Sequence, residues 1–141
     1  MPDYFEIKGF RVLDDTISSS VDFNAEASIK VKVKDEILHT VSDGDGPVHA
    51  LDKALRKALK EIYPTINNFK LADFKVRILN SSDGTGAKTR VHVETTDGFI
   101  HWDTVGVSVN ITEAAYIALV DSILYGLLLY NITPLNTINA K

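Results

Sequence analysis

The sequence contains two similar segments that lie 62 residues apart. Residues 29–46, IKVKVKDEILHTVSDGDG, match residues 91–108, VHVETTDGFIHWDTVGVS, and Gly44 falls on Gly106. Each segment holds an alternating apolar and polar run, a hairpin signal, a second strand, a glycine loop and then a helical pattern. The repeat constrains the fold strongly, because both copies must form the same supersecondary unit.

One more strand precedes each copy of the repeat, KGFRVLD in the first and ADFKVRIL in the second. The order strand, strand, strand, helix therefore occurs twice, with VKDE and TTDG as hairpin turns. We predict an α+β fold of duplicated βββα units, each a three-stranded antiparallel sheet with one helix. The units are expected at about residues 4–66 and 67–130 of a domain spanning 4–130, followed by a tail at 131–141.

The two predicted helices differ in character. The first is amphipathic, with Val48, Leu51 and Leu55 on one face and lysine and arginine on the other. The second, which begins near Asn110 with a capping box completed by Glu113, is apolar nearly all round. One small sheet cannot cover such a helix, so we expect a partner subunit or another domain against it.

Composition excludes several classes of function. With 141 residues, a net charge of −4 and scattered lysine and arginine, the chain offers no basic surface for nucleic acid or an acidic membrane. It has no cysteine, which removes disulfides and thiolate metal sites and fits the cytoplasm. The longest apolar run, AAYIALVDSILYGLLLY, is interrupted by Asp121 and Ser122, which favours a buried helix over a membrane span.

The glycine loop SDGDGPVH before the first helix has three interpretations. The first is a tight turn whose glycines adopt positive φ and whose Pro47 starts the helix. The second is a phosphate loop, although the lysine and hydroxyl of that motif are missing and two aspartates would repel phosphate. The third is a site for a small zwitterion, with helix N–H groups for a carboxylate and Asp43 or Asp45 for an ammonium group.

No catalytic or metal-binding constellation is visible in the sequence. The four histidines His39, His49, His92 and His101 lack the spacing of metal ligands, and no nucleophile elbow or triad-like arrangement occurs. Asp43 and Asp45 lack the other ligands of a calcium loop. We therefore predict no catalytic residue, no metal site and no cofactor in this chain.

The segments GDGPVHALDKALRKAL, LADFKVRIL and TVGVSVNITEAAYIALVDSI resemble the C-terminal regulatory domain of the 2-isopropylmalate synthase and citramalate synthase family. The resemblance covers the chain from about Tyr4 to Leu129. The opening YFEIKGFRVL and the helix ALRKALKEIYP are closer to the citramalate synthase branch.

This resemblance implies a regulatory domain that dimerises and binds the end-product amino acid. Full-length members condense acetyl-CoA with a 2-oxo acid on a metal-dependent TIM barrel, and this chain contains no such barrel. The resemblance implies a domain that is not itself an enzyme. It would bind isoleucine at a homodimer interface and mediate feedback inhibition of the condensation of acetyl-CoA with pyruvate. The alternatives are a leucine-binding domain of a 2-isopropylmalate synthase and a dimerisation module without a ligand.

The family's effector-binding positions can be transferred to two places in this chain. The charged end of the effector is expected at the helix start, at Gly44, Asp45, Gly46, Pro47 and Val48. Its side chain is expected in an apolar pocket on LADFKVRI, formed by Leu71, Phe74 and Ile78, which share one side only if the strand has a bulge after Phe74. The loop that follows is expected to close over the pocket with Thr85, Gly86 and Ala87.

Overall fold

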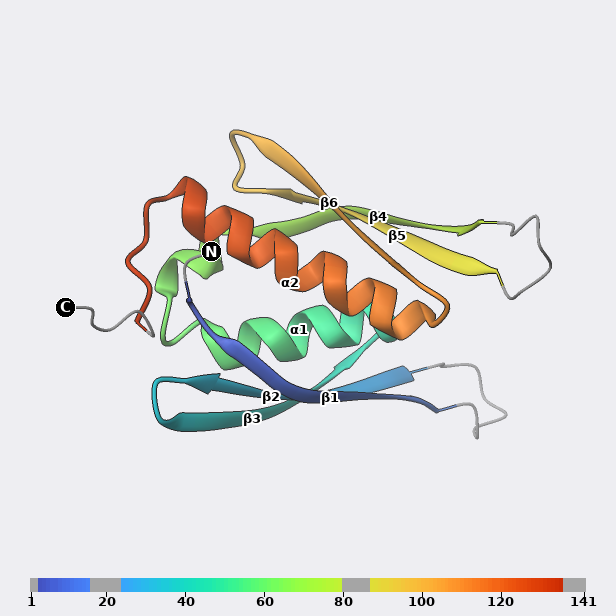
Figure 1. Cartoon of the computed structure of the whole chain (residues 1–141), viewed down its shortest axis with the longest axis horizontal. Coiled ribbons are helices and arrows are strands. Elements are labelled where there is room, and N and C mark those ends of the chain that lie inside the picture. The colour runs from blue at the N-terminus through green and yellow to red at the C-terminus, as the bar shows by residue number, and fades with distance from the viewer. Residues whose placement is uncertain (1–2, 16–23, 80–86, 136–141) are drawn as a thin grey trace. The chain divides into compact units, whose positions relative to one another are not determined.

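The computed structural model describes residues 3–15, 24–79 and 87–135. Its elements are, in order, β1 (Glu6–Asp15), β2 (Asn24–Val33), β3 (Glu36–Gly44), α1 (Pro47–Leu59), a 3-10 turn (Pro64–Asn68), β4 (Lys70–Leu79), β5 (Lys88–Thr96), β6 (His101–Ser108) and α2 (Ile111–Leu129) (Figure 1). The strands form two antiparallel sheets, ordered β1-β2-β3 and β4-β5-β6. The predicted α+β fold with two βββα units is confirmed.

The first unit buries the apolar side of its central strand under α1. The alternating residues of β2 that point to the helix are all buried: Ala25, Ala27, Ile29, Val31 and Val33. Leu51, Leu55 and Leu59 supply the buried face of α1. Alternation of period two on the strand and a stripe of period 3.6 on the helix therefore meet in one core.

Residues from three distant parts of the chain complete the first unit. The Tyr63 hydroxyl donates to the Tyr4 carbonyl at 2.6 Å, and the Tyr4 hydroxyl donates to the Ile132 carbonyl at 2.7 Å. Contacts accordingly group the described residues up to Pro64 with 131–135, and group Thr65–Tyr130 as the second unit.

The second unit packs α2 chiefly on β5 and β6. Val91 and Val93 are buried, and Trp102 is buried with its Nε1 donating to the Ser122 carbonyl at 3.0 Å. By length and composition α2 could cross a membrane, and 44% of its most apolar window is buried inside the protein. One helix of this kind is weak evidence for a membrane span.

The structural repeat is 64 residues, so the predicted offset of 62 is wrong. Sixty-four residues separate Glu6 from Lys70, where β1 and β4 begin, and Pro47 from Ile111, where the helices begin. A side-chain bond repeats with the same spacing, because Thr40 donates to the Ala54 carbonyl at 2.8 Å and Thr104 donates to the Ala118 carbonyl at 2.7 Å. Both hairpins agree with the repeat of 64, because Lys32 pairs with Ile37 and Thr96 pairs with His101, whereas the offset of 62 was set by matches such as Gly44 with Gly106.

The bulge in β4 also differs from the prediction. The register of β4 against β5 shifts between Leu71 and Asp73, before Phe74 and not after it. The same irregularity lies 64 residues earlier, between Ile7 and Gly9 in β1. A bulge adds one residue on one strand, so it brings Leu71 to the side of Phe74, and plain alternation then continues to Ile78.

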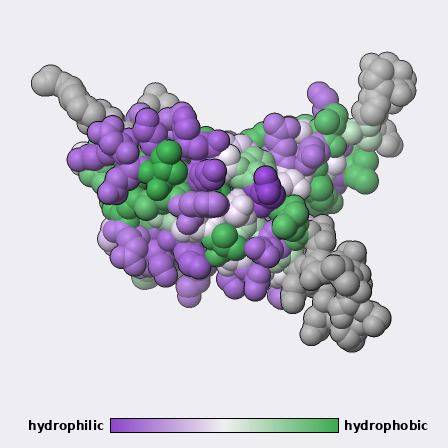
Figure 2. All heavy atoms as spheres, turned by 90° about the horizontal axis from the view of Figure 1, so that it is seen from below, coloured by the Kyte–Doolittle hydropathy of each residue, from purple (hydrophilic) through white to green (hydrophobic). Residues whose placement is uncertain are grey.

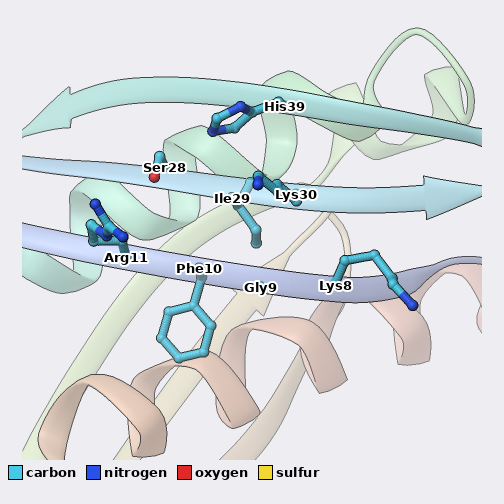
Figure 3. Close-up of a pocket in the computed structure, with 8 residues that line it drawn as sticks. All are labelled: Lys8, Gly9, Phe10, Arg11, Ser28, Ile29, Lys30 and His39. Carbon is cyan, nitrogen blue, oxygen red and sulfur yellow. The ribbon is translucent and has the colours of Figure 1, made fainter.

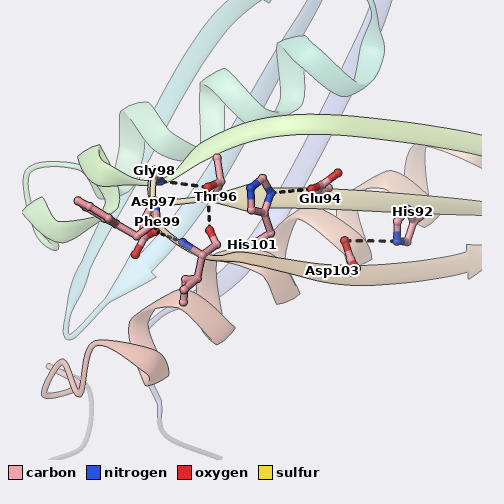
Figure 4. A network of polar contacts seen from close by, with 9 residues as sticks. His92, Glu94, Thr96, Asp97, Gly98, Phe99, His101 and Asp103 are labelled. Atoms are coloured by element: carbon pink, nitrogen blue, oxygen red, sulfur yellow. Dashed lines mark hydrogen bonds and ion pairs between the residues drawn. The ribbon is translucent and has the colours of Figure 1, made fainter.

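The two predicted hairpin turns are present, with residues in left-handed conformation. Lys34 has φ 56° in the first turn and Gly98 has φ 98° in the second. In the second turn the Asp97 carboxylate accepts from the N–H groups of Phe99 at 2.8 Å and Ile100 at 2.9 Å (Figure 4). Tyr130, just after α2, donates to the other Asp97 oxygen at 2.6 Å. These bonds, the Ile100 bond first and then the Tyr130 bond, lower the pKa of Asp97 to about 2.

The Asp97 turn should make part of the stability depend on acid. Since the pKa of Asp97 falls below its ordinary 3.8 on folding, its stabilising effect is present above about pH 4 and is lost as the pH falls towards about 2. The free energy of unfolding of the Asp97→Asn variant should therefore approach that of the wild type between pH 4 and pH 2. Denaturant titrations at several pH values measure this, and parallel pH profiles for the two proteins would contradict it.

A buried hydroxyl in the second unit offers a test of the core. Thr95 is 0% exposed, and its Oγ1 has no hydrogen-bond partner among the described residues. Thr95→Val removes this unpaired group at constant shape, so the free energy of unfolding should rise by about 1 kcal/mol. Thr104→Val is the matched control, because it removes a bonded hydroxyl and should lower the stability by about the same amount. A loss of stability in Thr95→Val would contradict the prediction.

Candidate functional site

The tight-turn interpretation of the loop between β3 and α1 is confirmed for Pro47, which begins the helix, but its expectation of positive φ at the glycines is wrong. Gly98 is the glycine with positive φ among the described residues, and Gly46 is extended, with φ −161°. Any residue can adopt the backbone conformation of Gly46. The glycines at 44 and 46 must therefore be explained by the room that is available for a side chain, and not by the conformation of the backbone.

Gly44 is required by the close approach of α1 to β3. A Cβ at Gly44 would lie 2.4 Å from the backbone nitrogen of Ala50, whereas a Cβ at Gly46 would meet nothing within 4 Å. Gly44 is buried and Gly46 is half-buried. Gly44 is thus a packing residue that sets the start of the helix close to the sheet, while the missing side chain of Gly46 leaves open space beside that start.

The N-terminus of α1 has no side-chain cap. The first helical hydrogen bond runs from the Ala50 N–H to the Gly46 carbonyl at 2.9 Å. The N–H groups of Val48 and His49 come before this bond and therefore have no carbonyl partner within the helix. In α2 the equivalent groups are capped, because the Asn110 side chain accepts from the N–H groups of Thr112 at 2.8 Å and Glu113 at 3.1 Å. The start of α1 therefore combines uncapped donors with the positive end of the helix dipole, an arrangement that favours a carboxylate.

Polar groups around this loop fit the other end of a zwitterion. The Asp45 side chain is 99% exposed, and its Oδ2 lies 3.9 Å from His49 Nδ1. The Asp45 N–H donates to the same imidazole nitrogen at 3.2 Å. His49 was not among the predicted site residues. Its position four residues after Asp45 is the signal that could have indicated its contact with Asp45. Val48 is buried, so it offers only its backbone N–H.

The residues predicted for the apolar pocket form a row along the edge strand β4. Phe74 is 40% exposed and Ile78 is 67% exposed, and Leu71 is half-buried. The pairing of Phe74 with Val93 and of Val76 with Val91 shows that this row lies on the face that α2 covers. Val76, at 43% exposure, belongs to the row and was missed, because the bulge was expected after Phe74.

The predicted site residues therefore fall into two clusters, one in each unit. Gly44–Val48 belong to the first unit, and Leu71, Phe74 and Ile78 belong to the second. Thr85 and Gly86 lie outside the described residues, and Ala87 is exposed just before β5. Over the ranges that the structure describes, no three histidine, aspartate or glutamate side chains come together in a way that could hold a metal ion.

The fold and the helix start point to a regulatory class of protein. Residues 3–127 match the model of the LeuA allosteric (dimerisation) domain, and the chain belongs to this family. The resemblance seen in the sequence is confirmed.

Among individual proteins, the chain is similar to enzymes named (R)-citramalate synthase. It is 50% identical over 131 residues to the one from Aquifex aeolicus, covering 89% of this chain and 24% of that protein. It is 48% identical over 124 residues to the one from Geobacter sulfurreducens, with 88% and 24% covered. It is 50% identical over 126 residues to the one from Synechocystis, covering 87% of this chain and 23% of that protein. The chain thus spans about a quarter of the length of these relatives.

The two glycines of the loop should respond differently to the same substitution. Gly44→Ala places a Cβ against the α1 backbone, so we expect a loss of about 1–3 kcal/mol in the free energy of unfolding. In Gly46→Ala the new Cβ meets open space, so the free energy of unfolding should fall by only about 0.5 kcal/mol, because alanine is less favourable than glycine at a helix N-cap. Chemical denaturation of both variants measures the difference, and equal losses would contradict the packing role of Gly44.

Proposed function

We propose that this chain is the effector-binding regulatory domain of a citramalate synthase and that its effector is isoleucine. The family and the relatives support the regulatory role, and the uncapped start of α1 beside Gly46 is the observation that carries the binding proposal. In the whole protein, a catalytic barrel would condense acetyl-CoA with pyruvate with the help of a divalent metal, and isoleucine bound here would inhibit that reaction in the cytoplasm.

The first cluster supplies opposite charges for an amino acid. The carboxylate of isoleucine would accept from the N–H groups of Val48 and His49, and the ammonium group would lie near Asp45. A fully exposed ion pair contributes at most about 1 kcal/mol, so Asp45 can add substantial affinity only if something excludes water around it. A second copy of the chain would do so, which is why we place the bound effector at a homodimer interface.

The resemblance to the family assigns the side chain of the effector to the second cluster, which is an apolar surface of the second unit. A micromolar dissociation constant corresponds to about −8 kcal/mol, and burying one aliphatic side chain contributes about 1.5–3 kcal/mol. The row of Leu71, Phe74 and Ile78 is exposed enough to take that role, with Val76 as a further member. The two charged ends would supply most of the rest.

Two alternatives have their own support. Leucine differs from isoleucine only in the place of one branch, so the same clusters could serve a 2-isopropylmalate synthase. A dimerisation module without a ligand is favoured by the apolar side chains that α2 leaves exposed, which are Ile111, Tyr125, Leu128 and Leu129. Because a ligand of the native state raises its stability, ligand-dependent unfolding separates these functions.

Thermal unfolding of the chain with isoleucine, leucine or valine at millimolar concentration tests the proposal. At about 100 times the dissociation constant, the ligand should add about 2.7 kcal/mol to the stability. A response to isoleucine alone is expected. A response to leucine alone would identify leucine, and not isoleucine, as the effector. No response to any of the three amino acids would favour the dimerisation module.

The variant Gly46→Val tests where the ligand binds. Its side chain would fill the open space beside the helix start, so the isoleucine response should be lost while the unliganded fold is retained. Gly9→Val is the matched control, since the Cβ position of Gly9 is also open, and it should respond to isoleucine as the wild type does. Leu71→Ala should bind more weakly and discriminate less between isoleucine and leucine. Unchanged binding in both Gly46→Val and Leu71→Ala would contradict the site.

A further inference from the structure

The first sheet carries a basic depression on its outer face, the face turned away from α1. The depression has a volume of about 380 Å³ and is lined by Lys8, Gly9, Arg11, Ser28, Lys30 and His39 (Figure 3). All three strands contribute, because Lys30 pairs with Gly9 on one side and with His39 on the other, and Arg11 pairs with Ser28. Gly9 has no side chain to fill the space above the strand.

The positive groups of this depression have little local compensation. Lys8 Nζ lies 3.3 Å from Glu6 Oε2, and both side chains are at the surface. Across residues 3–15, 24–79 and 87–135, no ion pair involves Arg11, Lys30 or His39. Lys30 faces Gly9 on β1 and His39 on β3, so no carboxylate lies directly opposite it. The cluster stands in a chain with a net charge of −4, on a face where hydrophilic side chains predominate (Figure 2).

The second unit shows that the fold does not need Lys30 or His39, although Lys75 occupies the position of Arg11. At the positions 64 residues later, Gly9, Lys30 and His39 are replaced by Asp73, Glu94 and Asp103.

Two histidines of that second outer face have carboxylate partners. His92 Nε2 lies 3.5 Å from Asp103 Oδ1, and His101 Nδ1 lies 2.6 Å from Glu94 Oε2 (Figure 4). At the positions of Lys30 and His39 the same three-stranded scaffold thus carries carboxylates in its second copy, and those carboxylates have histidine partners.

We propose that the outer-face depression of the first sheet binds a small phosphorylated molecule through its phosphate group. Arg11 offers a planar pair of donors that matches two phosphate oxygens, Lys30 adds a point charge, and the Ser28 hydroxyl adds a neutral donor. The site is separate from the proposed isoleucine site, because α1 covers the opposite face of the same sheet. It would give this domain a second ligand.

Inorganic pyrophosphate is the probe for the first experiment, with sodium chloride added to keep the ionic strength constant. NMR spectra of the four histidine rings should show a saturable shift of the His39 signals and smaller shifts for His49, His92 and His101. A parallel titration with inorganic phosphate tells a monophosphate ligand from a diphosphate ligand. Equal shifts in all four histidines, a larger shift at His49 than at His39, or no saturable shift would overturn the proposal. So would citrate binding as tightly as pyrophosphate, because the site would then not select phosphate.

Equivalent positions in the two units provide matched variants. Arg11→Gln should weaken pyrophosphate binding at least about tenfold, because it removes a paired donor and a charge. Lys75→Gln, at the equivalent position of the second unit, removes the same charge from the chain and should leave the binding unchanged. Lys30→Gln is a second test in case Arg11→Gln does not fold, which thermal unfolding checks. Equal effects of the variants in the first and second units would mean that net charge alone is responsible, and would overturn the proposal.

Discussion

Close packing of one helix on one face of a three-stranded sheet is the interaction on which this structure depends. It requires small groups where the helix meets the sheet, and a Cβ at Gly44 or Gly106 would lie within 2.4 Å of the helix backbone. Threonine hydroxyls bond across the same contact, from Thr40 to the Ala54 carbonyl and from Thr104 to the Ala118 carbonyl. This packing also holds the start of α1 beside the end of β3, where the candidate carboxylate site lies.

The width of a helix explains which apolar residues stay exposed. A helix is about 10 Å across, roughly two strand spacings, so α2 centred over β5 and β6 leaves the edge strand β4 partly uncovered. The row that contains Phe74, Val76 and Ile78 is the result. A dimerisation domain needs such an apolar surface.

Duplication gave the chain two copies of one scaffold, and the copies differ where function is expected. Gly46 leaves the start of α1 uncapped, whereas Asn110 caps the start of α2. The outer faces differ in the same manner, with Lys30 and His39 in the first unit and Glu94 and Asp103 in the second. Since both copies fold alike, the shared fold by itself does not require these differences.

The sequence by itself determined the fold class, the hairpins, the helix starts and the family, because periodicity, turn residues and caps act over a few neighbouring residues. Tertiary structure alone decided the repeat length of 64, the bulge before Phe74 and the different roles of Gly44 and Gly46. It also added Val76 and His49 to the candidate site. Strand register and the distance between a helix and its sheet depend on residues far apart in the chain, and no local pattern contains them.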